Sequence, residues 1–397
     1  MRILVLSHLY PGARDPTAGT FVHEQVRALI ELGQDVRVVS PRGLAPPLGS
    51  RWAGHRAVPG GDRVEGVPVL HPRKLALPGG RLGRWNAEAM RAAIRGPLRR
   101  VHRRWPFQVV HAHMLVPDGW AAARVAAGLG VPVLATAHRA DVLDVPARGG
   151  AQRAQVVQAL ESVDQVVAVS RAVRAACEAL AVMDRPVAVV PNGADLRVFH
   201  PMDRREARRR LGLPDDEPVV AFVGVLTPRK GIDTLVEALG LLAARPGGAP
   251  VLAVAGEGEL RAPLEQRAAA LGIGERIRFL GKLPHDEVPW AMAAGDVFCL
   301  PSLSEGLPTV VCEAMACGRA VVATAVDGTP EIVDDGATGL LVPPRDPRSL
   351  ADALARLLGD PPLVRRMEQE ALRRARATYT WEANARSHVA LYEALAG

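Results

Sequence analysis

The sequence predicts an α/β protein built from two doubly wound domains in tandem, on three observations. At 397 residues the chain exceeds what one hydrophobic core usually organises, so two domains are expected. Short aliphatic runs alternate with amphipathic stretches along most of it, which is typical of a parallel sheet with helices on both faces. This alternation stops once, in a polar and turn-rich segment from His200 to Pro218 that we interpret as a short helix and linker.

Each half of the chain contains a series of expected strands. In the first half these are Ile3–Leu6, Val36–Val39, Val67–Leu70, Gln108–His111, Val133–Thr136, Val166–Val169 and Val187–Val190. In the second half they are Val219–Val223, Val251–Ala255, Ile277–Leu280, Val297–Leu300 and Ala320–Thr324. Amphipathic helices are expected over Thr20–Leu32, Asp118–Leu129, Arg171–Leu180 and Trp381–Leu395, and an exposed loop over Leu44–Gly66.

These elements divide the chain into four parts. We expect a first Rossmann-like domain over residues 1–200, a linker over 201–218 and a second Rossmann-like domain over 219–378. Residues 379–397 contain the last helix, which we expect to cross back to the first domain.

Composition is that of a globular protein, with 48% hydrophobic and 23% charged residues and no apolar run near the ~20 residues of a membrane span. The N-terminus enters a strand pattern at Arg2 without the regions of a signal peptide, so we expect a cytoplasmic location. The four cysteines show no CxxC pair or nearby histidine cluster, so we expect buried free thiols and neither disulfide nor metal site.

Positive charge is concentrated in the first half. Residues 1–200 contain 26 Lys and Arg against 15 Asp and Glu, whereas the rest contains 23 against 27. Eight arginines between Arg81 and Arg104 are accompanied by one acid, Glu88. This segment is either a solvated helix or a contact for anionic lipid or an anionic acceptor. A contact with lipid would place the protein at the inner face of the membrane. We expect no nucleic-acid partner.

Ligands of open α/β sheets bind at the carboxyl ends of strands, and two such sheets facing each other would create a cleft. After the first strand, a loop from Ser7 to Thr20 contains Gly19 just before a helix. A loop of this kind could bind a phosphate at the helix N-terminus. It lacks the GxGxxG pattern, however, and Gly19 is also compatible with a plain turn. His138 and Asp141 follow Val133–Thr136, and His113 follows an earlier strand. A histidine there is either structural or a residue of the site.

Two positive side chains, Arg229 and Lys230, stand at a helix start, where the helix dipole disfavours cations. An anion between them would resolve the conflict, and Lys230 is one of only three lysines, with Lys74 and Lys282. We therefore predict that they clamp a pyrophosphate. Gly256 and Gly258 also end a strand before a helix.

Two glutamates, Glu305 and Glu313, lie around a Gly-Leu-Pro turn. They could form an acid/base pair, half of a metal site, or two hydrogen-bond acceptors for a polyol. Pro308 suits a first helical turn, which places Glu305 in the preceding loop and Glu313 inside the helix. We expect the amides of Leu307, Thr309 and Val310 to face the same ligand, and favour the two-acceptor interpretation.

These motifs together resemble the GT-B glycosyltransferases of family 4, also called glycosyltransferase group 1, which are retaining and metal-independent. The most specific motif is Glu305-x7-Glu313, and Leu6–Pro11 with Gly19–Leu29 resembles the teichuronic-acid-biosynthesis branch. Supporting segments are Val190–Asp195 with Phe199, Arg229–Gly231, Thr329–Glu331, Gly336–Leu340 and Tyr379–Trp381.

The resemblance implies transfer of a hexosyl or N-acetylhexosaminyl group from a UDP- or GDP-sugar to a glycan, lipid-linked or small-molecule hydroxyl acceptor, without a cofactor, in cell-surface polysaccharide or glycolipid synthesis. It implies His138, Glu305 and Lys230 as catalytic residues, with Glu305 on the donor sugar and Glu313 on the ribose. Donor contacts would come from Gly19, Arg229, Lys230, Gly256, Gly258, Gly306, Leu307, Thr309 and Val310. His113, Arg139 and Asp141 would line the acceptor side.

Two positions depart from the family pattern: Val225 replaces a common arginine, and Arg139 a small glycine. Three other functions are compatible with such a fold. A phosphorylase would need a pyridoxal-binding lysine in the second domain. It is disfavoured because the lysines of that half, Lys230 and Lys282, do not lie near the Glu-x7-Glu loop in sequence. A sugar-nucleotide epimerase and a non-catalytic nucleotide-sugar-binding protein remain as alternatives.

Overall fold

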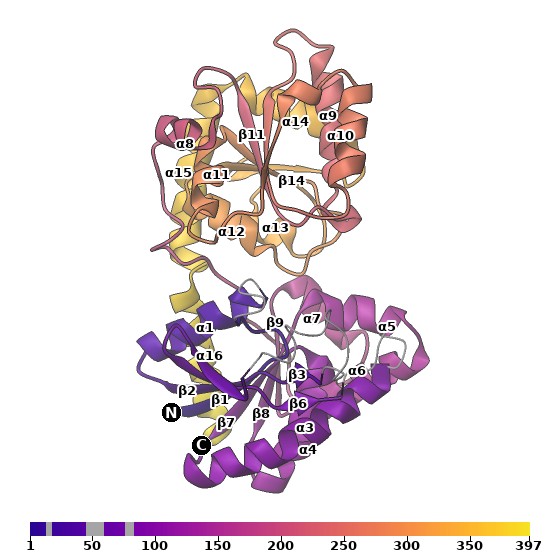
Figure 1. The fold of residues 1–397 in the computed structure, drawn as a ribbon, viewed down its shortest axis with the longest axis vertical. Coiled ribbons are helices and arrows are strands. Elements are labelled where there is room, and N and C mark those ends of the chain that lie inside the picture. The colour runs from indigo at the N-terminus through magenta and orange to yellow at the C-terminus, as the bar shows by residue number, and fades with distance from the viewer. Residues whose placement is uncertain (13–17, 45–58, 76–82) are drawn as a thin grey trace. The chain divides into compact units, whose positions relative to one another are not determined.

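A computed structural model describes residues 1–12, 18–44, 59–75 and 83–397 of the chain. It divides into two compact units (Figure 1). The first comprises Met1–Pro191 together with Trp381–Gly397, and the second comprises Asn192–Thr380. Within the described residues no helix is long and apolar enough to cross a membrane, and no cluster of three or more His, Cys, Asp or Glu side chains could hold a metal ion.

The first unit is built on one large sheet with the strand order β10-β9-β8-β7-β1-β2-β5-β4. Its strands are β1 (Arg2–Leu6), β2 (Asp35–Val39), β4 (Gly61–Val64), β5 (Val67–Leu70), β7 (Val109–His113), β8 (Val133–Ala137), β9 (Gln165–Ala168) and β10 (Ala188–Val189). All neighbours pair in parallel except β4, which is antiparallel to β5. Two short strands, β3 (Arg42–Gly43) and β6 (Arg73–Lys74), pair separately.

Helices cover this sheet and explain why β1, β7 and β8 are almost entirely buried, although β7 includes His111 and His113. They are α1 (Thr20–Glu31), α3 (Gly83–Arg104), α4 (Trp120–Ala126), α5 (Val145–Ala147), α6 (Gly150–Ser162), α7 (Arg171–Glu178) and the C-terminal α16 (Trp381–Ala396). α16 completes the core of this unit, because Trp381, Ala385 and Tyr392 pack in one cluster with Val5 and Val26. The expected crossing of the last helix to the first domain is thus present.

The second unit has a fully parallel sheet with the order β13-β12-β11-β14-β15-β16. Its strands are β11 (Val219–Val223), β12 (Val251–Ala255), β13 (Ile277–Gly281), β14 (Val297–Leu300), β15 (Ala320–Thr324) and β16 (Gly339–Val342). The helices are α8 (Arg204–Leu211), α9 (Ile232–Ala243), α10 (Arg261–Ala270), α11 (Val288–Ala294), α12 (Thr309–Ala316), α13 (Thr329–Ile332), α14 (Pro347–Leu358) and α15 (Pro361–Thr378). Two doubly wound α/β units confirm the predicted fold class.

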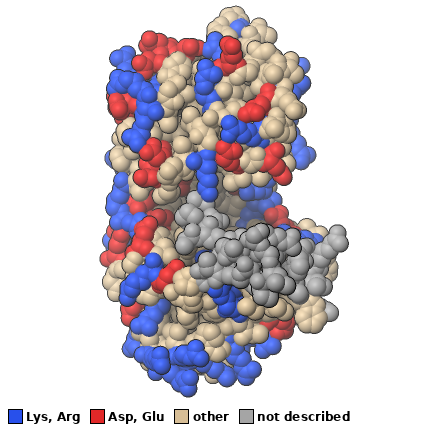
Figure 2. Space-filling view, viewed as in Figure 1, with Lys and Arg blue, Asp and Glu red and all other residues tan. Residues whose placement is uncertain are grey.

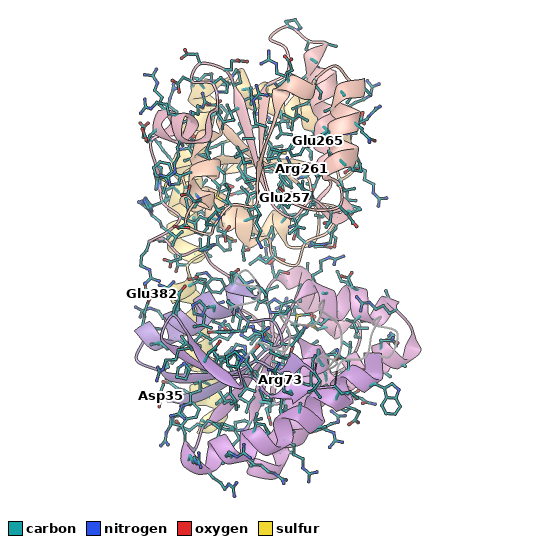
Figure 3. All side chains as sticks on the ribbon, viewed as in Figure 1. Asp35, Arg73, Glu257, Arg261, Glu265 and Glu382 are labelled. Carbon is teal, nitrogen blue, oxygen red and sulfur yellow. The ribbon has the colours of Figure 1, made fainter. Side chains whose placement is uncertain are left out.

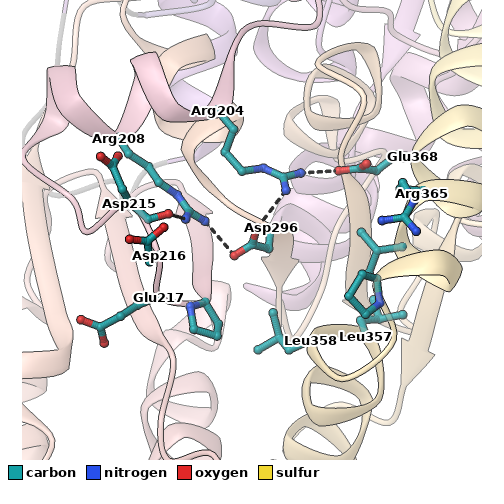
Figure 4. Close-up of a pocket in the computed structure, with 13 residues that line it drawn as sticks. Arg204, Arg208, Asp215, Asp216, Glu217, Asp296, Leu357, Leu358, Arg365 and Glu368 are labelled. Atoms are coloured by element: carbon teal, nitrogen blue, oxygen red, sulfur yellow. Dashed lines mark hydrogen bonds and ion pairs between the residues drawn. The ribbon is translucent and has the colours of Figure 1, made fainter.

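The segment 201–218 contains the expected short helix, α8, but it is not a separate linker, because α8 is anchored to the second sheet. Arg208 of α8 is buried and donates to Asp296 at 2.7 Å and to the carbonyl of Ala294 at 3.0 Å. Arg204 donates to Asp296 at 3.0 Å and to Glu368 of α15 at 2.7 Å, and so links the two carboxylates (Figure 4). Asp296 also accepts the N–H of Val219, so this network holds the amino ends of β11 and β14.

Other expectations also needed correction. The first unit ends at Pro191 and not at residue 200, because Ala194 bridges to Thr380 within the second unit. Part of the expected loop Leu44–Gly66 is strand β4, and residues 45–58 lie outside the described residues. The helix expected over Asp118–Leu129 is divided into a π-helical turn (Leu115–Gly119), α4 and a 3-10 turn (Ala127–Leu129).

Candidate active site

The loops that leave β11 and β14 at the carboxyl edge of the second sheet meet at one carboxylate, Glu305. Lys230 donates to Glu305 Oε1 at 2.6 Å, and Ser302 Oγ donates to the same oxygen at 2.6 Å. Arg229 Nη1 lies 3.5 Å from Oε2. The glutamate is buried, and the Lys230 side chain is only 14% exposed. The anion expected between the two cations is therefore supplied, in this structure, by Glu305 itself.

Charge favours the ionised form of Glu305. Burial alone raises the pKa of this carboxyl, but the positive charge of Lys230 and the hydrogen bonds from Lys230 and Ser302 outweigh burial, with a further contribution from Arg229. The net result is a pKa below the ordinary glutamate value. Glu305 is thus a carboxylate acceptor at neutral pH and not a proton donor.

Backbone contacts fix this arrangement. The N–H of Glu305 donates to Asp327 Oδ2 at 2.8 Å, and the N–H of Leu303 donates to the carbonyl of Arg229 at 2.8 Å. Gly231 has a positive φ of 62°, and a Cβ there would lie 2.0 Å from the carbonyl oxygen of Pro301. The two loops approach each other so closely that only glycine fits between them.

Helix α12 begins at Thr309, so Pro308 is its N-cap residue and not part of its first turn as expected. No side chain caps this end, and the amides of Leu307, Thr309 and Val310 have no acceptor among the described residues. Such amides and the helix dipole favour an anion. As expected, Glu305 precedes the helix and Glu313 lies within it, half-buried.

Gly256 and Gly258 join the loops after β11 and β12. A Cβ on Gly256 would lie 1.9 Å from the carbonyl oxygen of Gly224, and one on Gly258 would lie 2.4 Å from that of Leu226. Between them, Glu257 pairs with Arg261 at the start of α10, at 2.6 Å (Figure 3). These two glycines are required for loop-to-loop packing, which is a role separate from the donor contact predicted for them.

In the first unit, His138 follows β8 at the carboxyl edge of the sheet, and its ring packs edge-on against Phe21 with centroids 4.9 Å apart. Burial lowers the pKa of His138 to about 4, with a smaller contribution from His388, so its ring is neutral. Its Nε2 is buried without a hydrogen-bond partner among the described residues. A neutral imidazole with one unpaired nitrogen can exchange a hydrogen bond with a ligand.

The residues predicted for the acceptor side differ in their access. Asp141 is fully buried, and its two oxygens accept the N–H groups of Leu115 and His138, both at 2.8 Å, so it holds the loop instead of facing a ligand. Burial raises its pKa to about 7 against the opposing effect of these bonds. Arg139 pairs with Asp144 at 2.6 Å.

His113 is 2% exposed, and within the part of the chain that the structure describes neither ring nitrogen has a hydrogen-bond partner. Gly19 has a φ of 66°, and a Cβ there would lie 2.3 Å from the carbonyl oxygen of Leu9, so the local turn requires glycine whether or not a phosphate binds. The loop that it ends includes residues 13–17, which lie outside the described residues.

Sequence reasoning missed several residues that shape these edges. Ser302 and Asp327 hold Glu305, yet a serine and an aspartate in turns carry no distinctive pattern. Asp118, fully buried, accepts the backbone N–H of His8 and contacts its ring, which joins the loops after β1 and β7. His388 and Tyr392 of α16 were also missed. Their spacing of four residues, which places both on one face of a helix, was the signal that the sequence offered.

Comparison with known proteins assigns the chain to a class. The model for Glycosyltransferase Family 4 matches residues 18–198, and that for Glycosyl transferases group 1 matches residues 203–374. A Bacillus subtilis (strain 168) protein assigned to teichuronic acid biosynthesis as a glycosyltransferase is 32% identical over 364 residues, covering 90% of this chain and 89% of the relative. A D-inositol 3-phosphate glycosyltransferase of Geodermatophilus obscurus is 34% identical and covers 97% of this chain and 86% of its own length.

Among solved structures, sucrose-phosphate synthase from Thermosynechococcus elongatus superposes with a TM-score of 0.83 at 26% identity, over 100% of this chain and 99% of the other. The fold and these matches define a glycosyltransferase with the GT-B fold. More particularly, the chain belongs to glycosyltransferase family 4, as the sequence motifs predicted.

Proposed function

We propose that this glycosyltransferase moves a hexosyl or N-acetylhexosaminyl group from a nucleoside-diphosphate sugar to a hydroxyl acceptor with retention of anomeric configuration. The observation that carries the proposal is the meeting of Lys230, Arg229 and Glu305 at the uncapped start of α12. Two cations and unpaired amides suit a pyrophosphate, and a buried carboxylate suits sugar hydroxyls. The teichuronic acid relative supports a role in cell-surface polymer synthesis.

The residues act in this proposal through position and charge. Lys230, Arg229 and the amides of Leu307, Thr309 and Val310 stabilise the departing nucleoside diphosphate. Glu305 holds the donor sugar and Glu313 the ribose, and His138 acts as a further catalytic residue. With no nucleophile assigned near the anomeric carbon, the leaving phosphate serves as base for attack from the same face.

The test combines donor binding with product analysis. Thermal shift with UDP-glucose, GDP-mannose and ADP-glucose identifies the donor class, because a ligand bound only to the folded state raises Tm. Proton NMR of the product then reports its anomeric configuration. Lys230→Ala and Glu305→Ala should each lower turnover by at least about 10²-fold. Lys282→Ala, which changes an exposed lysine of the same unit, is the matched control.

Three outcomes would contradict the proposal. Near-wild-type turnover in Lys230→Ala would remove its assigned role, and inversion of the anomeric centre would exclude same-face attack. Conversion of the donor alone into a second sugar isomer would indicate an epimerase.

We further propose that the enzyme binds an anionic membrane surface, at the inner face, through α3. Ala87, Met90, Ile94 and Leu98 form its buried face. The opposite face exposes Arg95, Arg99, Arg100, Arg103 and Arg104. Figure 2 shows Lys and Arg side chains gathered at the lower end of the first unit, where α3 runs in Figure 1. Arg81 of the predicted basic segment lies outside the described residues.

Flotation with phosphatidylglycerol vesicles tests this contact. Each arginine near an anionic surface contributes about 1 kcal/mol, so the triple variant Arg95→Gln, Arg99→Gln and Arg103→Gln should weaken binding by roughly a hundredfold. A second triple variant, with glutamine at Arg365, Arg366 and Arg373 on exposed positions of α15, is the control and should bind as the wild type does. Equal loss in both triple variants, or no binding by the wild type, would refute a specific surface on α3.

A further inference from the structure

Four histidines from different parts of the sequence stack in one column inside the first unit. His388 of α16, His111 and His113 of β7, and His138 after β8 follow one another in this order. Their consecutive ring centroids are 5.1, 4.3 and 5.9 Å apart, with interplanar angles of 24°, 30° and 23°. The column thus links the C-terminal helix to the proposed catalytic histidine.

The inner end of the column is fixed by hydrogen bonds. Tyr392 Oη lies 2.6 Å from Nδ1 of His111, and Thr136 Oγ1 lies 2.8 Å from its Nε2. His388 Nδ1 donates to the carbonyl of Asn384 at 2.9 Å. His111, His388 and Tyr392 are at most 1% exposed, so these rings have little freedom to turn.

The outer end has no such anchors. Among residues 1–12, 18–44, 59–75 and 83–397, neither ring nitrogen of His113 has a hydrogen-bond partner, and Nε2 of His138 has none either. Ring contacts therefore orient His113: it stacks on His111 and His138 and meets Phe21 edge-on, with centroids 6.3 Å apart. His113 together with Phe21 bounds His138. Burial lowers the pKa of all four histidines, and the neighbouring rings lower that of His111 further, so the column consists of neutral imidazoles that do not repel one another.

Helix α16 is itself tied to the elements around the site. Gln25 of α1 donates to Asn384 at 2.7 Å, and Asn384 donates to the carbonyl of Pro191 at 2.8 Å. Pro191 is the last residue of the first unit before the chain enters the second. The face of α16 that carries Asn384, His388 and Tyr392 is consequently held at both α1 and β7.

We infer that α16 positions His138 for sugar transfer through this column, with Tyr392 and His388 as positioning residues. Neither touches the reacting atoms in this account; each acts through His111 and His113. The inference rests on the proposed role of His138 in transfer. It gives the last helix a function in catalysis beyond completing the core.

The test compares two buried tyrosines that each lose one hydroxyl group. Tyr392→Phe removes the bond to His111, whereas Tyr379→Phe removes a bond to the carbonyl of Glu331 in the second unit. Turnover of UDP-glucose, GDP-mannose and ADP-glucose is followed by nucleoside diphosphate release. Since misplacement of a reacting group by about 1 Å can cost up to ~10²-fold, we expect Tyr392→Phe to lower kcat roughly tenfold or more with KM for the donor unchanged. His388→Phe, which keeps a stacking ring, should retain more activity than His388→Ala.

A second readout is independent of turnover. In protein labelled at histidine, the ring resonances of His138, assigned with His138→Gln, should shift in Tyr392→Phe and stay in place in Tyr379→Phe. Unmoved His138 resonances, or equal kcat in the two tyrosine variants, would overturn the inference. If the wild type turns over none of the three donors, the proposed function fails, while the resonances still decide whether α16 sets the ring of His138.

Discussion

Replacing Glu305 with glutamine leaves Lys230 buried without its counterion. The Glu305 and Lys230 side chains are 8% and 14% exposed and their charged atoms lie 2.6 Å apart. Removing one partner of a buried ion pair typically costs 3–5 kcal/mol, because the remaining charge stays desolvated. Two features reduce this cost: glutamine can still accept a hydrogen bond from Ser302, and Arg229 is 43% exposed, so water can solvate its charge. We therefore expect Glu305→Gln to lower the free energy of unfolding by about 3 kcal/mol, the lower end of this range.

Hydrogen exchange of second-unit peptides measures this loss locally, in the full chain. Lys230→Met should cost a similar amount, because Glu305 then lacks its main cation. The double variant should cost less than the sum of the two single variants by about 1–3 kcal/mol, the usual coupling of residues in contact. Lys282→Met is the control for removing a lysine of the same unit.

The pH dependence provides a second check on the same pair. The folded state holds the pKa of Glu305 below its unfolded value, so the stabilisation is present above the unfolded pKa and is lost as pH falls through the folded pKa. Additive single-variant losses at neutral pH, or an undiminished difference between wild type and Glu305→Gln in strong acid, would refute the reasoning. All three variants should lose transfer activity, since the pair is also the proposed donor contact.

Three further predictions follow from other residues. Burial lowers the pKa of His388 to about 4, so its contribution to stability is fully present above pH 6.5, falls by roughly 1.4 kcal/mol per pH unit between pH 6.5 and about 4, and is constant below that. Urea unfolding of His388→Phe should show a flatter decline than the wild type over this range. Gly256→Ala should destabilise the second unit far more than Gly272→Ala, whose φ is also positive but whose added Cβ meets nothing within 4 Å; equal shifts in Tm would be contrary to the loop packing. Asp296→Asn should lower the free energy of unfolding, measured by hydrogen exchange, by about 3–5 kcal/mol, because Arg204 and Arg208 lose their partner. KM for the donor should not change, because this network lies at the opposite strand ends from Glu305. A raised KM would contradict that separation.

Periodicity predicted most of the strands because buried parallel strands are nearly continuous apolar runs, as in Val219–Val223 and Val251–Ala255. Periodicity did not identify elements whose residues are mostly polar. Gly61–Val64 lies on the edge of its sheet and is half exposed, so it resembles a loop in sequence. The polar and charged residues around α8 suggested a short helix and linker, yet Arg208 is buried and donates to Asp296, a contact that only the folded chain brings together.

The residues of the candidate site were predictable where a single motif contains them, and their contacts were not predictable where segments distant in sequence meet. Glu305 and Lys230 were identified singly, but their direct contact at 2.6 Å was not foreseen, because 75 residues separate them. Helix spacing placed Glu313, and strand ends placed His138. The column of histidines joins residues 111, 113, 138 and 388, and no local pattern indicates a contact across such separations.

Calorimetric titration of UDP and GDP into the wild type and Lys230→Ala measures whether Lys230 holds the donor phosphates, with Lys282→Ala as control. At least one nucleotide should bind the wild type and Lys282→Ala alike. Lys230→Ala should bind it at least about tenfold more weakly, because it loses one charge-assisted contact of about 1.4 kcal/mol or more. Equal binding by wild type and Lys230→Ala would contradict the placement of the donor phosphates at the Lys230–Glu305 pair.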